Sequence, residues 1–211
     1  MGSKRTIGRP LKAAVFVSGS GSNLEALIRA EKAGRLGARI ELVVCDNPDA
    51  FAIVRANRHE KDVFLCEPKR FDSREDFEKA VVGVLKKKGV ALVILAGFMR
   101  ILTPYFIGAY RGRVLNIHPS LLPAFPGAHA IRDAYQHGAR VTGVTVHLVT
   151  DELDGGPILF QESVPVGPHE ELEELERRIH KVEHRLYPQA VRLFAQGKIH
   201  VMGKKVHITK T

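Results

Sequence analysis

The feature that most restricts the fold of this chain is residues 90–95, six apolar residues in direct succession. Such a run does not alternate between apolar and polar residues, so it predicts a strand buried on both faces, as in a parallel sheet covered by helices. Similar apolar runs at residues 11–17, 40–45 and 114–117 alternate with helical patterns over mostly short connections. This order predicts an α/β fold with a doubly wound, mostly parallel sheet.

The last third of the chain has a different pattern. Residues 141–149 alternate and residues 158–164 follow an acidic turn, which predicts a C-terminal antiparallel portion built on a long hairpin. Residues 170–196 predict a charged helix that Pro188 should break or kink, and residues 199–208 predict a small hairpin. The remaining expected elements are helices at 51–58, 72–88 (entered through Asp72) and 130–137, and a short strand at 63–65.

Length and composition predict one compact unit with anionic ligands. The chain has 211 residues, of which 45% are hydrophobic, so we expect a loose tail at residues 1–10 and a single domain at residues 11–211. The net charge of +9 favours phosphate esters or polycarboxylates as partners. Because the basic residues are scattered and the chain has no Trp, we expect no nucleic-acid partner.

The cysteines and the hydropathy pattern add expectations about the environment. Cys45 and Cys66 form neither a metal-ligand spacing nor a disulfide scaffold, and no segment approaches the length of a membrane span. We therefore expect a cytoplasmic protein, monomeric or homodimeric, that binds small molecules, contacts no membrane and holds no metal.

A glycine- and serine-rich segment at residues 18–23 separates the first predicted strand from a helical pattern. The exposed N–H groups of such a turn and the positive end of the helix suit a phosphate group. The segment is not a dinucleotide motif, because its third glycine would fall at Leu24, and it lacks the ending of a P-loop. It fits a phosphate monoester bound with help from Ser22 and Asn23, or equally a plain turn in which one of these residues caps the helix.

A second candidate site lies where the strand at residues 114–117 ends. Asn116 and His118 are two positions apart and point to the same face, just before a proline-rich loop. Taken alone, the pair fits a satisfied core Asn and a structural His better than a functional site. Asp154, in the acidic turn at residues 150–157, is a candidate carboxylate to keep His118 charged or oriented, although that turn could also be a solvated surface loop.

The Asn–His–Asp set suits a reaction in which negative charge develops on a carbonyl oxygen. No Ser or Cys is placed as a covalent nucleophile, which favours direct attack by an amine or by water. The residues alone therefore indicate acyl transfer or hydrolysis beside a phosphate-binding turn.

Four motifs together give a more specific resemblance. They are Ser-Gly-Ser-Gly-Ser-Asn-Leu at 18–24, Leu-Ala-Gly-Phe-Met-Arg-Ile-Leu at 95–102, Asn-Ile-His-Pro-Ser-Leu-Leu-Pro at 116–123 and Thr-Asp-Glu-Leu-Asp-Gly-Gly-Pro at 150–157. In this order and spacing, from residue 11 to about 194, the chain resembles the phosphoribosylglycinamide formyltransferases, also called glycinamide ribonucleotide transformylases. The resemblance outweighs the structural interpretation of Asn116 and His118.

The resemblance implies transfer of the formyl group of 10-formyltetrahydrofolate, a co-substrate, to the amine of 5′-phosphoribosylglycinamide in de novo purine biosynthesis. Direct amine attack through a tetrahedral intermediate is expected, without a metal. It implies His118 as general acid/base, Asn116 as oxyanion donor and Asp154 as the partner carboxylate of His118.

The resemblance also assigns two binding sites. The ribonucleotide site would comprise Gly21, Ser22, Asn23, Leu24, Glu25, His180, Lys181, Val182 and Glu183. The folate site would comprise Arg74, Met99, Arg100, Ile101, Leu102, Asn116, Thr150, Asp151, Glu152, Leu153 and Asp154.

Three other functions share some of these features. Formyltetrahydrofolate hydrolases have the same catalytic strand but use water, need no phosphate turn and usually carry a preceding regulatory domain, which we expect this chain to lack. Methionyl-tRNA formyltransferases carry an additional carboxyl-terminal domain that 211 residues are not expected to hold. A non-enzymatic folate- or nucleotide-binding module is the third alternative.

Overall fold

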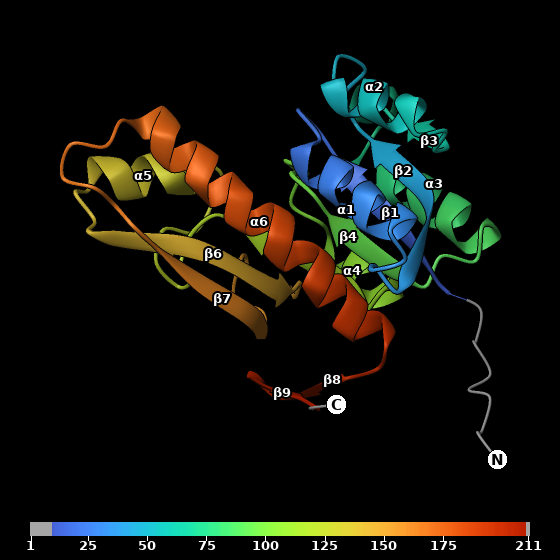
Figure 1. The fold of residues 1–211 in the computed structure, drawn as a ribbon. Coiled ribbons are helices and arrows are strands. Elements are labelled where there is room, and N and C mark those ends of the chain that lie inside the picture. The colour runs from blue at the N-terminus through green and yellow to red at the C-terminus, as the bar shows by residue number, and fades with distance from the viewer. Residues whose placement is uncertain (1–9, 210–211) are drawn as a thin grey trace.

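The computed structural model describes residues 10–209, and a seven-stranded sheet with the order β3-β2-β1-β4-β5-β6-β7 forms its centre (Figure 1). Of the tail predicted at residues 1–10, residues 1–9 lie outside the described part. The strands are β1 (Leu11–Val17), β2 (Ala38–Cys45), β3 (Val63–Leu65), β4 (Leu92–Leu95), β5 (Val114–His118), β6 (Val141–Leu148), β7 (Ile158–Pro165), β8 (Ile199–Met202) and β9 (Lys205–Ile208). The helices are α1 (Ser22–Lys32), α2 (Phe51–Arg58), α3 (Arg74–Lys87), α4 (Pro104–Ala109), α5 (Ala130–Gln136) and α6 (Leu172–Ala195), with a short 3₁₀ helix, η1 (Pro68–Arg70).

The strand order confirms the predicted doubly wound sheet. From β1 the chain moves outward through β2 and β3 and then returns to the other side of β1 with β4 and β5, all five strands being parallel. The order therefore reverses between β1 and β4, and the carboxyl ends of strands at such a switch point are the usual place for a ligand site. β6 and β7 then add the predicted antiparallel portion, and β8 and β9 form the predicted small hairpin.

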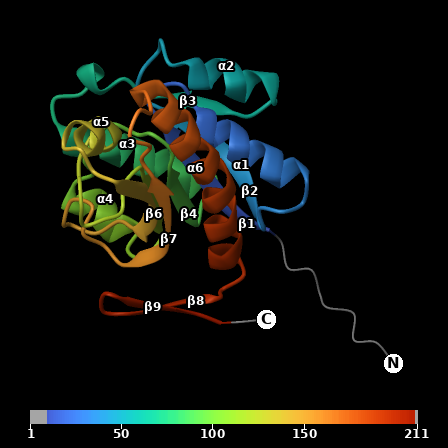
Figure 2. The ribbon, with the colours of Figure 1, turned by 60° about the vertical axis from the view of Figure 1, so that its left-hand side comes forward.

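Helices cover both faces of the sheet (Figure 2). One core contains residues of α1, α2, α5 and α6, and the opposite core contains residues of α3 and α4. In β4, Leu92 and Ile94 belong to the first core, whereas Val93 and Leu95 belong to the second. The apolar run at residues 90–95 is thus uninterrupted because its strand has no solvent-facing side.

Most predicted bounds differ from the structure by one or two residues, and three differences have a clear physical cause. α3 is capped by Ser73, whose Oγ accepts from the backbone N–H of Asp76 at 3.1 Å, so the cap lies one residue after the predicted Asp72. β4 begins at Leu92 because the N–H of Val90 is still bonded to the carbonyl of Leu85 in the end of α3. Of the break or kink predicted at Pro188, the break does not occur, since α6 continues to Ala195.

Packing on both sides of Pro188 accounts for this continuity. Tyr187, Ala190 and Val191 are fully buried, so the turns before and after the proline are both held against the sheet. The tyrosine hydroxyl also reaches the carbonyls of Leu95 and Leu115, at 2.7 and 3.0 Å, at β4 and β5. Tertiary packing thus outweighs the loss of one helical hydrogen bond.

The described residues also bear on two smaller expectations. Cys45 and Cys66 are free and buried, and burial raises the pKa of Cys66 to about 11, as expected for small core residues. Within residues 10–209, no helix combines the length and the apolar character that crossing a bilayer requires.

Candidate active site

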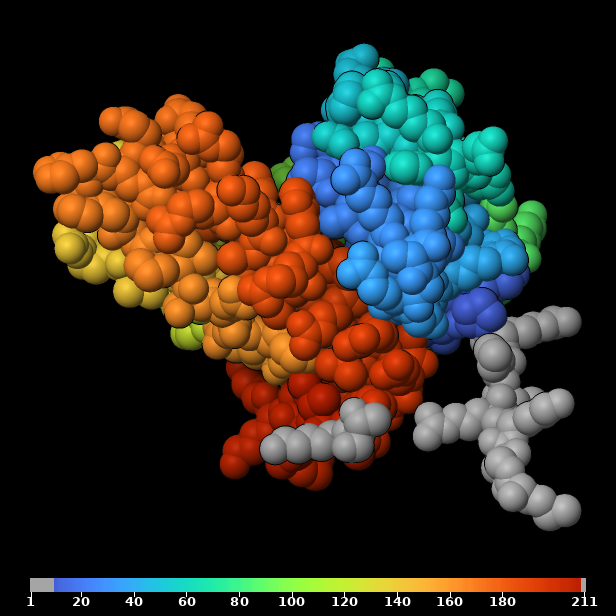
Figure 3. Space-filling model, in the orientation of Figure 1, coloured from blue at the N-terminus to red at the C-terminus, as the bar shows by residue number. Residues whose placement is uncertain are grey.

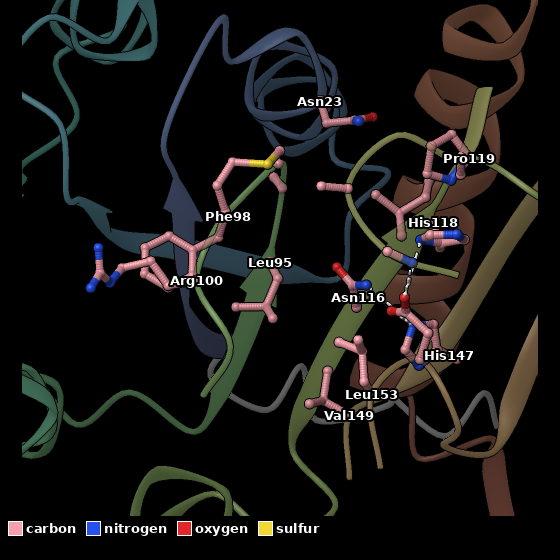
Figure 4. A pocket seen from close by; sticks show the side chains of 18 of the residues that line it. Asn23, Leu95, Phe98, Arg100, Asn116, His118, Pro119, His147, Val149 and Leu153 are labelled. Carbon is pink, nitrogen blue, oxygen red and sulfur yellow. Dashed lines mark hydrogen bonds and ion pairs between the residues drawn. The ribbon is translucent and has the colours of Figure 1, made fainter. Parts of the chain in front are cut away.

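A cavity of about 630 Å³ lies at the carboxyl ends of β1, β4 and β5. All four sequence motifs contribute to its wall, although they are as far apart in the chain as residues 19 and 154. α6 closes one end with Glu176, His180 and Glu183. Figure 4 shows the side chains of Asn116, His118 and His147 gathered on one side of this cavity. The topological switch point is therefore where the predicted site residues meet.

His118 and Asp154 converge in this cavity. Nδ1 of His118 lies 3.6 Å from Oδ2 of Asp154, and the two side chains are only 5% and 9% exposed. Nε2 of His118 lies 2.8 Å from the carbonyl oxygen of Phe125, which can only accept, so Nε2 carries a proton. The carboxylate accepts from the N–H of Gly127 at 2.9 Å, which fixes its position. It therefore faces the ring nitrogen of His118 that the Phe125 carbonyl leaves free.

Asn116 is oriented by His147, the residue opposite it in the β5–β6 pairing. Nδ2 of Asn116 lies 3.1 Å from Nε2 of His147, and Nδ1 of His147 lies 2.9 Å from the carbonyl of Leu148. Because that carbonyl requires a proton on Nδ1, Nε2 is the acceptor for the amide of Asn116. Burial lowers the pKa of His147 despite the opposing effects of Leu148 and Asp154, so the ring stays neutral.

His147 is the main residue that sequence reasoning missed. It lies within the alternating run at residues 141–149, but that run does not show the cross-strand pairing that sets it against Asn116. His129 and Arg132 also line the cavity, from the segment that enters α5, and no spacing in the sequence connects them with the other motifs.

The turn before α1 leaves the amino end of that helix open. Gly21 is the capping residue, with φ of 72° and no side-chain cap, so neither Ser22 nor Asn23 has the capping role of the alternative interpretation. A Cβ at Gly21 would lie 2.7 Å from Ala52, so the position requires glycine for both its conformation and its space. The first-turn N–H groups are thus available to an anion.

Three donors from the segment after β2 hold the carbonyl groups of this turn. Nδ2 of Asn47 donates to Ser18 at 3.2 Å, the N–H of Ala52 to Gly19 at 3.0 Å, and Nε of Arg55 to Ser20 at 2.9 Å. The carbonyl groups of three consecutive residues therefore accept hydrogen bonds from within the protein. The guanidinium of Arg55 also lies over the ring of Phe51, at 5.1 Å from its centroid. These contacts preorganise the turn before any ligand arrives.

Glu183 connects the turn to α6. It is buried, and its Oε2 accepts from Nδ2 of Asn23 at 3.0 Å and from Nδ1 of His180 at 2.9 Å. The hydrogen bond to Glu183 raises the pKa of His180 above its ordinary value, against the effect of burial. Oδ1 of Asn23 is buried and has no hydrogen-bond partner. This end of the cavity therefore offers an imidazole that is protonated more readily than a free one, and an unsatisfied amide oxygen.

The other end of the cavity is apolar. Met99, Ile101 and Leu153 line it with exposed side chains, whereas Leu102 is buried behind them. The N–H of Met99 donates to Oγ of Ser18 at 2.9 Å, so this wall is attached to the glycine-rich turn. An apolar wall that ends in a few fixed polar groups suits a flat aromatic ligand with a polar edge.

Most of the predicted binding residues line the cavity, including Arg100 and the whole run from Thr150 to Asp154 with Asp151 and Glu152. Five do not. Leu24 is buried in the core, Glu25 faces a neighbouring cavity, Arg74 is exposed at the start of α3, and Lys181 and Val182 follow His180 on α6. A helix turns about 100° per residue, so positions directly after His180 point away from the face that carries His180 and Glu183.

Comparison with known proteins agrees with this geometry. Residues 11–191 match the formyl transferase family. A phosphoribosylglycinamide formyltransferase of Bacillus subtilis (strain 168) is 43% identical over 181 residues, covering 86% of this chain and 93% of that protein. One from Escherichia coli (strain K12) is 40% identical over 185 residues, covering 88% and 87%.

A solved structure extends the agreement to three dimensions. The crystal structure of glycinamide ribonucleotide transformylase 1 from Symbiobacterium toebii has a TM-score of 0.94 and 44% identity, over 96% of each chain. Family, sequence and fold therefore agree over nearly the whole described chain. The chain belongs to the formyl transferase family and, within it, to the phosphoribosylglycinamide formyltransferases.

Proposed function

We propose that this chain transfers the formyl group of 10-formyltetrahydrofolate to the amine of 5′-phosphoribosylglycinamide, the purine-biosynthetic reaction of its family, with Asn116, His118 and Asp154 as catalytic residues. The observation that carries the proposal is the sharing of one cavity by two features. The anion-binding turn at residues 18–23 and the buried His118–Asp154 pair both line it. A substrate with a phosphate at one end and a nucleophilic amine at the other would span these two features.

The phosphate would bind at the amino end of α1. The N–H groups after Gly21 and the positive helix end supply the anion site, and the imidazolium of His180 adds a positive charge. Glu183 would accept from a ribose hydroxyl or from the amine, and the free amide oxygen of Asn23 adds an acceptor. This end positions the substrate and takes no part in bond making.

Asn116 would stabilise negative charge on the formyl oxygen. One N–H of its amide is held by Nε2 of neutral His147, which fixes the plane of the group. The second N–H of Nδ2 remains for the oxygen on which charge develops as the amine attacks the formyl carbon. Because the orientation is set in advance, little reorganisation is needed at that moment.

His118 would manage the proton. A new carbon–nitrogen bond forms to the substrate amine, which gives up a proton, and the bond to the folate nitrogen breaks as that nitrogen gains one. The proton on Nδ1 of His118, held by Asp154, is the one suited to this exchange, because Nε2 is engaged by Phe125. Asp154 keeps the charged ring stable between the two transfers.

The folate would lie against the apolar end of the cavity. Met99, Ile101 and Leu153 offer apolar surface to its ring system, and the backbone of residues 150–154 offers polar groups at the edge. Bound there, 10-formyltetrahydrofolate supplies the activated formyl group; the chain supplies position, oxyanion donor and proton carrier.

A direct assay separates this function from the alternatives. Purified protein is incubated with 10-formyltetrahydrofolate, with and without 5′-phosphoribosylglycinamide, and tetrahydrofolate release is followed. We expect release only with the ribonucleotide, together with formylation of its amine. Release without it would indicate hydrolase activity, and binding of both ligands without release would indicate a non-enzymatic binding module.

A further inference from the structure

A second cavity, of about 580 Å³, lies between α1 and α6 and shares Ser22 with the active-site cavity. The two helices lie side by side on the face shown in Figure 3, α1 in blue and α6 in orange to red. We call this cavity the α1–α6 groove. Five arginines line it: Arg29, Arg35, Arg55, Arg185 and Arg192.

The charge of the groove is strongly unbalanced. Among residues 10–209, Glu25 is the one acidic residue that lines the groove, and its carboxylate already contacts Arg29 at 2.7 Å, His59 at 3.1 Å and Arg55 at 3.6 Å. Arg185 is paired with Glu162, which lies outside the lining. No contact with a carboxylate is found for Arg35 or Arg192 in residues 10–209. The groove therefore keeps positive charge that no described acid neutralises.

The positive charge of the groove also affects His184, which lines it. Burial lowers the pKa of His184, and the positive charges of His180, Arg55 and Arg29 lower it further, against the opposing charge of Glu183. Nε2 of His184 is buried and has no hydrogen-bond partner in the described chain. The groove wall thus contains an unsatisfied polar atom as well as unpaired cations.

We propose that the α1–α6 groove binds a small polyphosphate anion, such as a nucleoside triphosphate, at a site separate from the ribonucleotide site. Arginine guanidinium groups match phosphate oxygens in charge and in paired N–H geometry. The five arginines come from α1, the loop after it, α2 and α6, and an anion with several phosphates offers a separate charged group to each of several of them. The volume is that of a small-ligand site.

The lining distinguishes this ligand from nucleic acid. Apart from the ring of His184, none of the described residues that line the groove is aromatic, so the described lining offers unpaired bases little surface on which to stack. The apolar part consists of Ala26, Ala30 and Pro188, which offers little area. Recognition therefore depends on the phosphates.

The test is calorimetric titration with inorganic tripolyphosphate and then with ATP, at 0.15 M ionic strength and with saturating 5′-phosphoribosylglycinamide. The saturating ribonucleotide fills the phosphate turn, so residual binding reports another site. We compare the wild type with a double variant, Arg35→Gln and Arg192→Gln, which keeps both side-chain stems. The matched control is Arg111→Gln, an exposed arginine outside both cavities.

We expect the wild type and Arg111→Gln to bind tripolyphosphate equally, and the double variant to bind it at least about tenfold more weakly. Formyl transfer without polyphosphate should be unchanged, which also shows that the variant is folded. If the double variant does not fold, each single substitution is tested and should weaken binding by about threefold. The proposal is overturned by equal affinity in these variants, by loss of binding when the ribonucleotide is present, or by equal binding of sulfate.

Discussion

Replacing Asp154 by Asn tests the proton carrier without disturbing the loop. Asp154 has a φ of 51°, a left-handed conformation that Asn tolerates and that Ala adopts only with strain. The amide oxygen can still accept from the N–H of Gly127, now at 2.9 Å from the carboxylate. Asp154→Asn therefore removes the negative charge and little else.

The size of the effect follows from the geometry. Unit charges about 4 Å apart interact by about 4 kcal/mol at the effective dielectric that suits protein sites. Nδ1 of His118 and Oδ2 of Asp154 are 3.6 Å apart, with both side chains nearly buried, so solvent screens the pair little. That value is an upper bound and corresponds to about 1,000-fold in rate, so we expect kcat to fall about 10- to 1,000-fold.

Steady-state kinetics with both substrates provide the measurement. KM for the ribonucleotide should change little, because the phosphate turn is not touched by the substitution. Asp133→Asn is the matched control: it removes one carboxylate from α5 and lies outside the active-site cavity. A kcat of Asp154→Asn within about threefold of that control would refute the assigned role. A raised KM for folate with unchanged kcat would instead make Asp154 a folate-binding residue.

Three further predictions follow from the same site. Gly21→Ala should lower the melting temperature and raise KM for the ribonucleotide, because φ of 72° costs about 1–2 kcal/mol for a non-glycine residue and the new Cβ would meet Ala52. Glu183 raises the pKa of His180, so the positive charge of this residue persists above pH 6.5 and is lost as the pH rises through the folded pKa. When KM for the ribonucleotide is measured from pH 6 to 9, it should rise over the range in which that charge is lost. His180→Gln should show no such rise. Burial lowers the pKa of His147, so as the pH falls the unfolded chain binds a proton at this residue before the folded chain does. The free energy of unfolding therefore decreases as the pH drops from 6.5 toward the folded pKa. Urea midpoints measured at several pH values should show a smaller decrease in stability at acid pH for His147→Gln than for the wild type.

Much of the fold was predictable because the central strands appear in the sequence as short apolar runs. The unbroken apolar run at residues 90–95 required burial on both faces, and β4 is indeed shared by two cores. Boundaries were less predictable because they depend on tertiary contacts. Pro188 is an example: the sequence shows only the lost hydrogen bond, whereas burial of the flanking turns decides the outcome.

Site residues were predictable where they follow one another in the sequence. They were less predictable where the register between paired strands determines which residues meet. Residues 150–154 follow one another around a loop, so the motif located all of them at the cavity. His147 became part of the site only through its cross-strand pairing with Asn116. The resemblance assigned Lys181 and Val182 to the ribonucleotide site together with His180 and Glu183, but helical rotation places them outside the cavity.

Asp154 is followed by two glycines in the loop between β6 and β7. This loop places the buried carboxylate of Asp154 in the active-site cavity. Residues 149–157 connect β6 to its antiparallel neighbour β7, and the β6–β7 register shifts between Val146 and His147. A Cβ at Gly156 would lie 1.9 Å from the carbonyl oxygen of Leu148, and a Cβ at Gly155 would lie 2.2 Å from Glu152. At Gly156 the neighbour is backbone, so no other residue type permits so close an approach, because only glycine lacks the Cβ. At Gly155 the neighbour is an exposed side chain that can move. Gly156 therefore allows the chain to pass close to the end of β6, in the same loop that places Asp154 beside His118.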